Sequence, residues 1–171
     1  MDPEYAEAWS NKGWTLAKLH RYDEALKCIT KALELNPNLT EAQKLKQVVI
    51  QKQGSNKAED TTIWHNKGID LSDLGRYQEA IACFDKAIEI NPRCTESWIG
   101  KGSILYKLGK YKEALICYDE AIKIEPENCN VLFNKGMALG KLHRYIDKFR
   151  CLLRVVKIDP DYIKRRLRER S

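Results

Sequence analysis

The chain has 171 residues, of which 43% are hydrophobic and 32% charged, and a formal net charge of +6. No apolar run reaches the about 20 residues that cross a bilayer, so we expect no membrane-spanning helix. The opening MDPEYAEAW is acidic where a signal peptide would be basic and then apolar, so we expect no signal peptide. Residues 163–171 hold five basic residues and one acidic residue, so most of the positive charge lies in a tail.

The first predicted element is a pair of helices in residues 6–39. Its second half, ALKCITKALELNP, returns as AIACFDKAIEINP and ALICYDEAIKIEP, and a less faithful fourth copy reads FRCLLRVVKIDP. Apolar residues recur in each copy at three- and four-residue steps, which is the period of a helix and not of a strand. We therefore predict an all-α chain with helix pairs in residues 6–39, 61–94, 95–128 and 129–162.

A short turn separates the two helices of each pair. Gly75 and Gly109 stand where the first helix must end in a left-handed residue, which glycine adopts without the penalty of a Cβ atom. His20 and His143 replace them, and because histidine tolerates this conformation, we interpret both as turn residues rather than metal ligands. A proline follows each second helix: Pro37, Pro92, Pro126 and Pro160.

A glycine recurs in the middle of each first helix, where it costs about 1 kcal/mol relative to alanine. We therefore expect the second helix to approach closely at this glycine through small residues of its own. In the fourth pair Lys148 and Val155 replace those small residues, and we expect looser packing there. The glycines are Gly13, Gly68, Gly102 and Gly136, and the small residues are Ala25, Ala32, Ala80, Ala87, Ala114 and Ala121.

Residues 40–60 interrupt the repetition between the first and second pairs. The part from Glu41 to Gln53 has the apolar spacing of a helix, and the following GSNKAED reads as a linker. Two interpretations stay open. The extra helix caps the first pair with a local kink, or the linker is a hinge that lets the first pair pack on a second copy by domain swapping.

Four of the six cysteines hold one repeated position on the second helix of each pair. Successive copies lie one repeat apart, farther than the about 7 Å between Cα atoms that a disulfide allows. We predict buried packing residues rather than metal ligands, because no CxxC motif or paired histidine accompanies them. Six free thiols favour a reducing compartment, the cytoplasm. The repeated cysteines are Cys28, Cys83, Cys117 and Cys151, and Cys94 and Cys129 fall at junctions.

The tail YIKRRLRERS has two interpretations. Ile163 and Leu167 are four residues apart and would pack together on the last pair, which makes residues 163–171 a capping helix. Alternatively, the arginines form a basic patch for nucleic acid or an acidic partner.

The order of residues in each pair resembles the tetratricopeptide repeat, over about four fifths of the chain. The sequence is similar to long prokaryotic and archaeal arrays of this family, and the resemblance implies a right-handed superhelix whose concave groove binds peptides or proteins. The chain then divides into a repeat in 1–39, an extra helix and linker in 40–60, three repeats in 61–162 and a capping segment in 163–171. The second pair matches the signature at Trp64, Gly68, Leu71, Tyr77, Ala80, Phe84, Ala87 and Pro92.

The resemblance also implies where a ligand would bind, because the first helices of such repeats line the groove. In the family an asparagine near the tryptophan position often bonds the ligand backbone, and Asn11, Asn66 and Asn134 match it, while Gly100 breaks the series. The alternatives are that the asparagines are ordinary surface residues and that their apolar neighbours contact the adjacent helix. The predicted groove set is Asn11, Trp14, Lys18, His65, Asn66, Ile69, Ile99, Ser103, Tyr106, Lys107, Phe133, Asn134, Met137 and Lys141.

Charge and motif content narrow the function. The inward positions carry four basic and five acidic residues, whereas nucleic acid needs a basic track, so we do not expect it as a ligand. The basic clamp of chaperone-cofactor members is missing, since Glu96 and Gly100 stand at its third-repeat positions. No nucleophile motif or phosphate loop appears, so we expect no enzyme activity, metal or cofactor. The predicted function is an adaptor that binds a protein or peptide; the alternatives are self-assembly into a homo-oligomer and binding through the basic tail.

Overall fold

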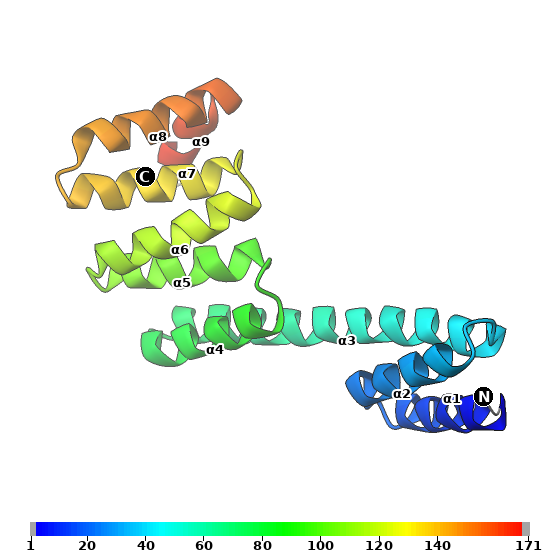
Figure 1. Ribbon diagram of the computed structural model, residues 1–171. Coiled ribbons are helices and arrows are strands. Elements are labelled where there is room, and N and C mark those ends of the chain that lie inside the picture. The colour runs from blue at the N-terminus through cyan, green and yellow to red at the C-terminus, as the bar shows by residue number, and fades with distance from the viewer. Residues whose placement is uncertain (1–2, 169–171) are drawn as a thin grey trace. The chain divides into compact units, whose positions relative to one another are not determined.

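The computed structural model describes residues 3–168, and in this range the chain forms nine α-helices and no strand (Figure 1). The helices group into a first compact unit, Met1–Glu59, and a second, Asp60–Ser171, with the boundary inside helix α3 (Thr40–Asp73). None of the helices in the described range is long and apolar enough to cross a bilayer. The all-α prediction is confirmed.

The first unit contains one helix pair and the beginning of α3. Helix α1 (Pro3–Lys18) packs on α2 (Tyr22–Leu35), whose inner face includes the fully buried Ala25 and Ile29. Ala42 and Val49 of α3 belong to the same core, because a seven-residue step returns to one face of a helix. The predicted extra helix therefore exists and packs on the first pair.

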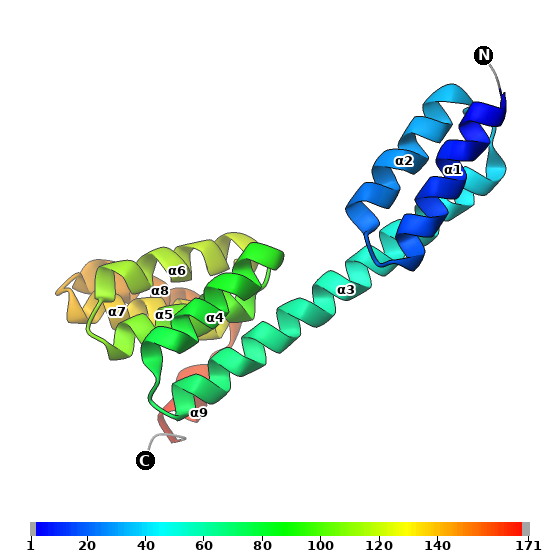
Figure 2. The same cartoon turned by 90° about the horizontal axis from the view of Figure 1, so that it is seen from below.

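The predicted linker after Gln53 is wrong. Helix α3 runs unbroken for 34 residues, so GSNKAED is helical and continues into the first helix of the second repeat (Figure 2). In this stretch Gly54 disfavours a helix by about 1 kcal/mol, and no proline ends it. Because helix growth is cooperative, the helical segments on both sides extend through GSNKAED and keep it helical. The domain-swapping alternative placed its hinge in this linker, and that form of it loses its basis.

The second unit stacks helices one after another, as Figure 1 shows for α4 to α8. The part of α3 from Asp60 onward pairs with α4, α5 pairs with α6, and α7 pairs with α8, which are the three predicted repeats. The short helix α9 follows. The bounds are α4 (Tyr77–Ile90), α5 (Thr95–Lys107), α6 (Tyr111–Ile124), α7 (Cys129–Lys141), α8 (Tyr145–Ile158) and α9 (Tyr162–Arg168).

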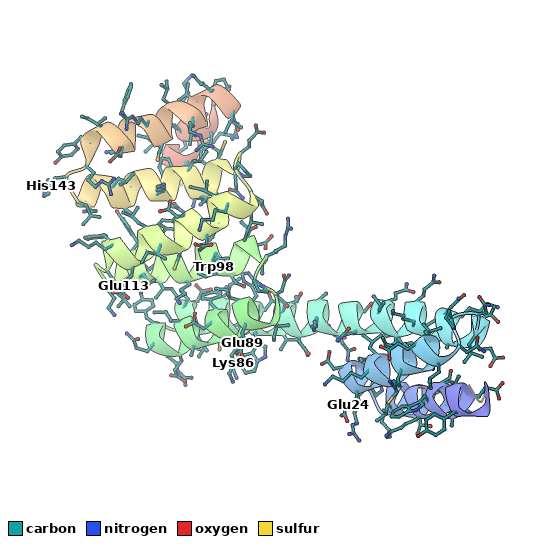
Figure 3. The ribbon with its side chains drawn as sticks, in the orientation of Figure 1. Glu24, Lys86, Glu89, Trp98, Glu113 and His143 are labelled. Atoms are coloured by element: carbon teal, nitrogen blue, oxygen red, sulfur yellow. The ribbon has the colours of Figure 1, made fainter. Side chains whose placement is uncertain are left out.

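The turns between paired helices have the predicted left-handed conformation. Gly75 and Gly109 have φ angles of 73° and 76°, and His20 and His143 have φ angles of 59° and 58°. Each histidine also places its Nδ1 within hydrogen-bond distance of a tyrosine hydroxyl two residues later, as for His143 at the turn before α8 (Figure 3). The interpretation of both histidines as turn residues is confirmed.

The mid-helix glycines are sites of close approach, but the partners differ from the prediction. A Cβ atom at Gly68 would lie 2.8 Å from Phe84 Cε1, and one at Gly102 would lie 2.7 Å from Tyr118 Cε1. Large side chains of the second helix fill most of the space that glycine leaves, and at Gly13 the carbonyl oxygen of Ala25 also approaches to 3.3 Å. At Gly136 the nearest side-chain atom would be 3.5 Å away, so the fourth repeat is the less tightly packed one, as expected.

The four repeated cysteines are buried, and all six cysteines are free thiols. Burial raises the pKa of Cys117 to about 11, so its thiol stays protonated at neutral pH. These cysteines pack in the core, as predicted.

The tail helix α9 docks partly as predicted. Tyr162 and Ile163 pack against the buried Leu132 and Val155 of the last repeat. Leu167, which was expected to share this contact, is 58% exposed. The capping interpretation therefore holds for the start of α9 and not for Leu167.

Candidate functional site

A cavity of about 270 Å³ lies in the second unit where α5, α6, α7 and α9 meet. Ser103, Tyr106 and Lys107 are spaced by three and four residues, so α5 presents them on one face. Asn134 and Met137 are three residues apart and share a face of α7 in the same way. Five of the predicted groove residues thus meet at one cavity, and Tyr118 and Arg166 complete its lining.

Tyr118 is the most enclosed of the lining residues, with 1% of its surface exposed. Burial raises the pKa of its phenol to about 12, and a hydrogen bond with the Ser103 side chain opposes this shift. The phenol is therefore neutral at physiological pH and brings a hydroxyl into an otherwise tightly packed place. Tyr106 is held at the other side by an edge contact with Tyr111, with ring centroids 5.3 Å apart.

Asn134 is oriented by a chain of hydrogen bonds along α7. Its Nδ2 donates to Asn130 Oδ1 at 3.2 Å, and the backbone amide of Asn130 donates to Asn128 Oδ1 at 3.1 Å. A carboxamide has two N–H donors and an acceptor oxygen, so this bond to Asn130 uses a fraction of its capacity. The rest of the amide can pair with the alternating donors and acceptors of an extended peptide backbone.

Among the described residues that line the cavity, the charged ones are Lys107 and Arg166, and both are cationic. The Lys107 Nζ also lies 5.8 Å from the centroid of the Tyr77 ring, which holds the ammonium near the wall. Two cations beside hydroxyl and amide donors favour a ligand group that carries negative charge.

The predicted groove residues of the second repeat do not line this cavity. The His65 ring lies 5.5 Å from that of Phe84 and its Nδ1 is 3.1 Å from Ser97 Oγ, so the histidine is half-buried and burial lowers its pKa. Ile99 of the third repeat does not line the cavity either, and it is partly buried against the core. Asn66 and Ile69 are exposed on α3.

The three predicted groove residues of the first unit do not share a single pocket. Trp14 and Lys18 border a hollow of about 250 Å³, with the lysine Nζ 5.1 Å from the tryptophan ring centroid. Asn11 does not line that hollow, and its backbone carbonyl accepts a hydrogen bond from Thr15 Oγ1 at 3.0 Å.

Two further predicted residues of the last repeat do not line the cavity. Phe133 was expected to be open to a ligand, and this is wrong: it is 4% exposed, and the Tyr162 ring of α9 stands 6.1 Å from it. The sequence did not show this because the docking position of α9 depends on tertiary contacts. Lys141 is exposed at the end of α7.

Tyr118 and Arg166 were not among the predicted groove residues. Tyr118 occupies the repeat position of Phe84, and its hydroxyl was the available signal, because a buried tyrosine hydroxyl needs a partner. Arg166 was assigned to the tail, and only the turn of α9 toward α7 brings it to the cavity. Among the residues that the structure describes, no cluster of histidine, cysteine or carboxylate side chains is arranged to hold a metal ion.

The tetratricopeptide repeat family matches residues 6–39, 65–128 and 117–149. Solved structures of that kind are similar in fold. The first such domain of Spaghetti (RPAP3), bound to the HSP90 peptide SRMEEVD, aligns with a TM-score of 0.60 at 20% identity and covers 65% of this chain and 90% of that one. For YrrB, a TPR protein with an unusual peptide-binding site, the TM-score is 0.58 at 20% identity, over 95% of this chain and 91% of that one.

MamA 41-end from Desulfovibrio magneticus RS-1 gives a TM-score of 0.57 at 22% identity, over 94% of this chain and 78% of that one. At such identities the likeness concerns the fold. A comparison with curated protein sequences found no match.

Proposed function

We propose that this chain, which belongs to the tetratricopeptide repeat family, is an adaptor that binds an extended peptide segment in the cavity between α5 and α7. The observation that carries the proposal is the convergence of Ser103, Tyr106, Lys107, Asn134 and Met137 on one cavity. Hydroxyl and amide groups there serve the peptide backbone, and the Met137 side chain serves an apolar residue. The work of the chain on this account is recognition and not catalysis.

We further propose that the bound segment places a carboxylate between Lys107 and Arg166. The two cations among the described lining residues support this choice of ligand. Two fold neighbours hold an acidic peptide, SRMEEVD, which is consistent with carboxylate recognition on this fold. The site proposed for this chain uses other positions than the family's clamp, because a Cβ atom at Gly100 would lie 2.6 Å from Phe84 Cζ and leaves no room for a clamp side chain.

The alternative of nucleic-acid binding through the tail has less support. Arg165 pairs with Asp159 and Arg166 lines the cavity, so two of the tail's basic residues already have positions on the folded unit.

The six free thiols support the cytoplasmic location expected from the sequence.

The test selects peptides that bind the wild-type chain from a random displayed library and measures their affinity by fluorescence polarisation. Lys107→Ala and Asn134→Ala should each weaken binding about tenfold, which corresponds to about 1.4 kcal/mol. Lys112→Ala is the matched control, because it removes the same charge from an exposed position of α6 outside the cavity lining. Equal affinities of the wild type and both cavity variants would contradict the proposal.

The source of the carboxylate is tested with the selected peptides themselves. Amidating the peptide C-terminus removes a terminal carboxylate, and replacing each Asp or Glu by Asn or Gln removes a side-chain one. Whichever change weakens binding to the wild type should have little further effect on Lys107→Ala, because both remove the same interaction. Full additivity of the two changes would show that Lys107 does not contact the carboxylate.

A further inference from the structure

Helix α8 carries a stripe of large apolar side chains that nothing in the described structure covers. Ile146 is 72% exposed, Phe149 66%, Leu153 43% and Val156 41%. Their spacing of three, four and three residues places all four on one face of the helix. We call this set the α8 stripe. Isolated exposed apolar residues are ordinary, but a row of four on one 14-residue helix indicates a contact surface.

The corresponding face of α6 shows what normally covers such a stripe. Leu115 stands at the repeat position of Phe149, and it is 9% exposed because it packs in one core cluster with Leu139 of α7. At the position of Leu153, α6 has Asp119, whose Oδ1 lies 2.5 Å from Lys135 Nζ of α7. In this inner repeat the next first helix therefore contacts the positions of Phe149 and Leu153, whereas Lys112, at the position of Ile146, is exposed.

The α8 stripe differs from the α6 face in a way that does not suit a helix left in water. Lys112 and Asp119 of α6 are replaced by Ile146 and Leu153. A repeat surface that faces water is expected to be more polar than one that the next repeat covers, and this surface is more apolar. The substitution pattern favours a surface that is buried against a partner.

The opposite end of the second unit has a complementary open face. Val131 in the last repeat is 0% exposed because the preceding repeat packs on it, whereas Ile63 at the same repeat position in α3 is 55% exposed. Leu142 is partly buried in the core, whereas Leu74 at its repeat position is 71% exposed. The start of the second unit thus exposes the residues that an inner repeat uses to contact the repeat before it.

We propose that the α8 stripe of one copy of this chain binds the Ile63 and Leu74 face of a second copy, in the arrangement by which α7 packs on α6. Both halves of this contact are present on the second unit, and the geometry of the joint already occurs between its inner repeats. Because the two faces differ, the contact is head-to-tail, and copies add one after another. The proposal does not depend on the cavity between α5 and α7.

Analytical ultracentrifugation of the full chain over a range of concentrations tests the contact. The wild type should form dimers and larger species as concentration rises. Phe149→Arg and Ile63→Arg should each remain monomeric, since each buries an unpaired charge in one of the two faces. Ile116→Arg is the matched control, because Ile116 is an exposed isoleucine of α6 that is 62% exposed and lies outside both faces.

Mixing the two monomeric variants separates head-to-tail contact from other modes. Phe149→Arg keeps an intact Ile63 face and Ile63→Arg keeps an intact α8 stripe, so the mixture should form dimers and stop there. If two α8 stripes instead bind each other, Ile63→Arg alone will associate as the wild type does, and the proposal is wrong.

Leu153→Asp sharpens the test further. In the head-to-tail arrangement this change rebuilds the inner-repeat ion pair, because Lys67 of α3 occupies the repeat position of Lys135. Association should therefore persist in Leu153→Asp at low salt, whereas any other apolar contact would be weakened by the new charge. Circular dichroism confirms that each variant is folded. A wild type that stays strictly monomeric up to about millimolar concentration would overturn the proposal.

Discussion

Phe84 and Tyr118 occupy the same position in successive repeats of the second unit, but their surroundings differ. The Phe84 ring lies between Gly68 and Gly100, and Cβ atoms at these glycines would lie 2.8 Å and 2.6 Å from its atoms. The Tyr118 ring also packs against a glycine, Gly102, but the repeat position of Gly100 is occupied by Asn134. Phe84 is 1% exposed, and Tyr118 borders the cavity of about 270 Å³.

The residue at this repeat position accompanies the difference between the two sites: glycine lies against a buried ring, and asparagine lines the cavity. Glycine at position 100 admits a buried aromatic ring beneath it, and asparagine at position 134 instead holds polar groups beside a tyrosine hydroxyl. The interruption of the asparagine series at Gly100 is therefore a packing device. The following predictions test this difference.

The largest effect is expected from Gly68→Leu, which drives a large side chain into the Phe84 ring. Overpacking of a filled core costs about 1–3 kcal/mol and occasionally more, and we expect about 3 kcal/mol here. Gly54→Leu in the same helix is the control, because a Cβ atom there meets nothing within 4 Å, and the better helix former should slightly stabilise the protein. Urea unfolding measures both, and equal stabilities of the two variants would refute the close packing at Phe84.

Two glycine-to-alanine substitutions, Gly100→Ala and Gly136→Ala, should change the stability by smaller amounts and in opposite directions. Gly100→Ala should destabilise the protein by about 1 kcal/mol, because the added methyl meets Phe84 Cζ at 2.6 Å in a core that resists overpacking. Gly136→Ala should stabilise it by up to about 1 kcal/mol, because the methyl finds ordinary contact at 3.5 Å and alanine favours the helix. Thermal unfolding curves compare the two, and a gain in stability for Gly100→Ala would break the comparison.

The tyrosine beside the cavity, Tyr118, predicts a pH dependence. Its pKa is raised from the ordinary value near 10 to about 12, so the folded state favours the neutral phenol, and the stability that this provides is complete below pH 10 and lost as pH rises through 12. Tyr118→Phe removes that titration and costs about 1 kcal/mol at pH 7 through the lost hydroxyl. The stability difference between wild type and variant, measured by urea unfolding, should shrink between pH 10 and 12. A constant difference would show that Tyr118 is not buried as a neutral phenol.

The smallest change in stability is expected from an ion pair that recurs beside both Phe84 and Tyr118. Lys101 pairs with Asp85 at 2.6 Å, and Lys135 pairs with Asp119 at 2.5 Å, so the same ion pair joins adjacent repeats beside each ring. Asp85→Asn and Asp119→Asn should each cost about 0.5 kcal/mol, and high salt should reduce both losses. Unequal losses by urea unfolding would mean that the surroundings of the two rings differ in more than their packing.

Much of the fold could be predicted from the sequence because it depends on local chemistry that recurs. The helical spacing, the left-handed turn at Gly75 and His143, and the closing prolines each act within a few residues, so one sequence suffices to recognise them. The continuity of α3 was not predicted because GSNKAED has no strong preference for either helix or loop. Cooperative helix growth from the segments on both sides makes it helical.

The candidate site was predictable only in part for a related reason. The helix faces of α5 and α7 follow from periodicity, so Ser103 and Asn134 were expected on one surface, and both line the same cavity. The fate of Phe133 and the arrival of Arg166 depend on where α9 docks, which is a long-range contact that local pattern does not encode.

The most direct measurement of the central claim uses the two methionines of the chain, Met1 and Met137. A ¹H–¹³C spectrum of protein labelled at the methionine methyl groups gives one signal for each, and Met137 lines the cavity. Titration with a peptide selected for binding should shift the Met137 signal. A peptide that binds tightly by calorimetry while the Met137 signal stays unchanged would contradict the assignment of the ligand to the cavity between α5 and α7.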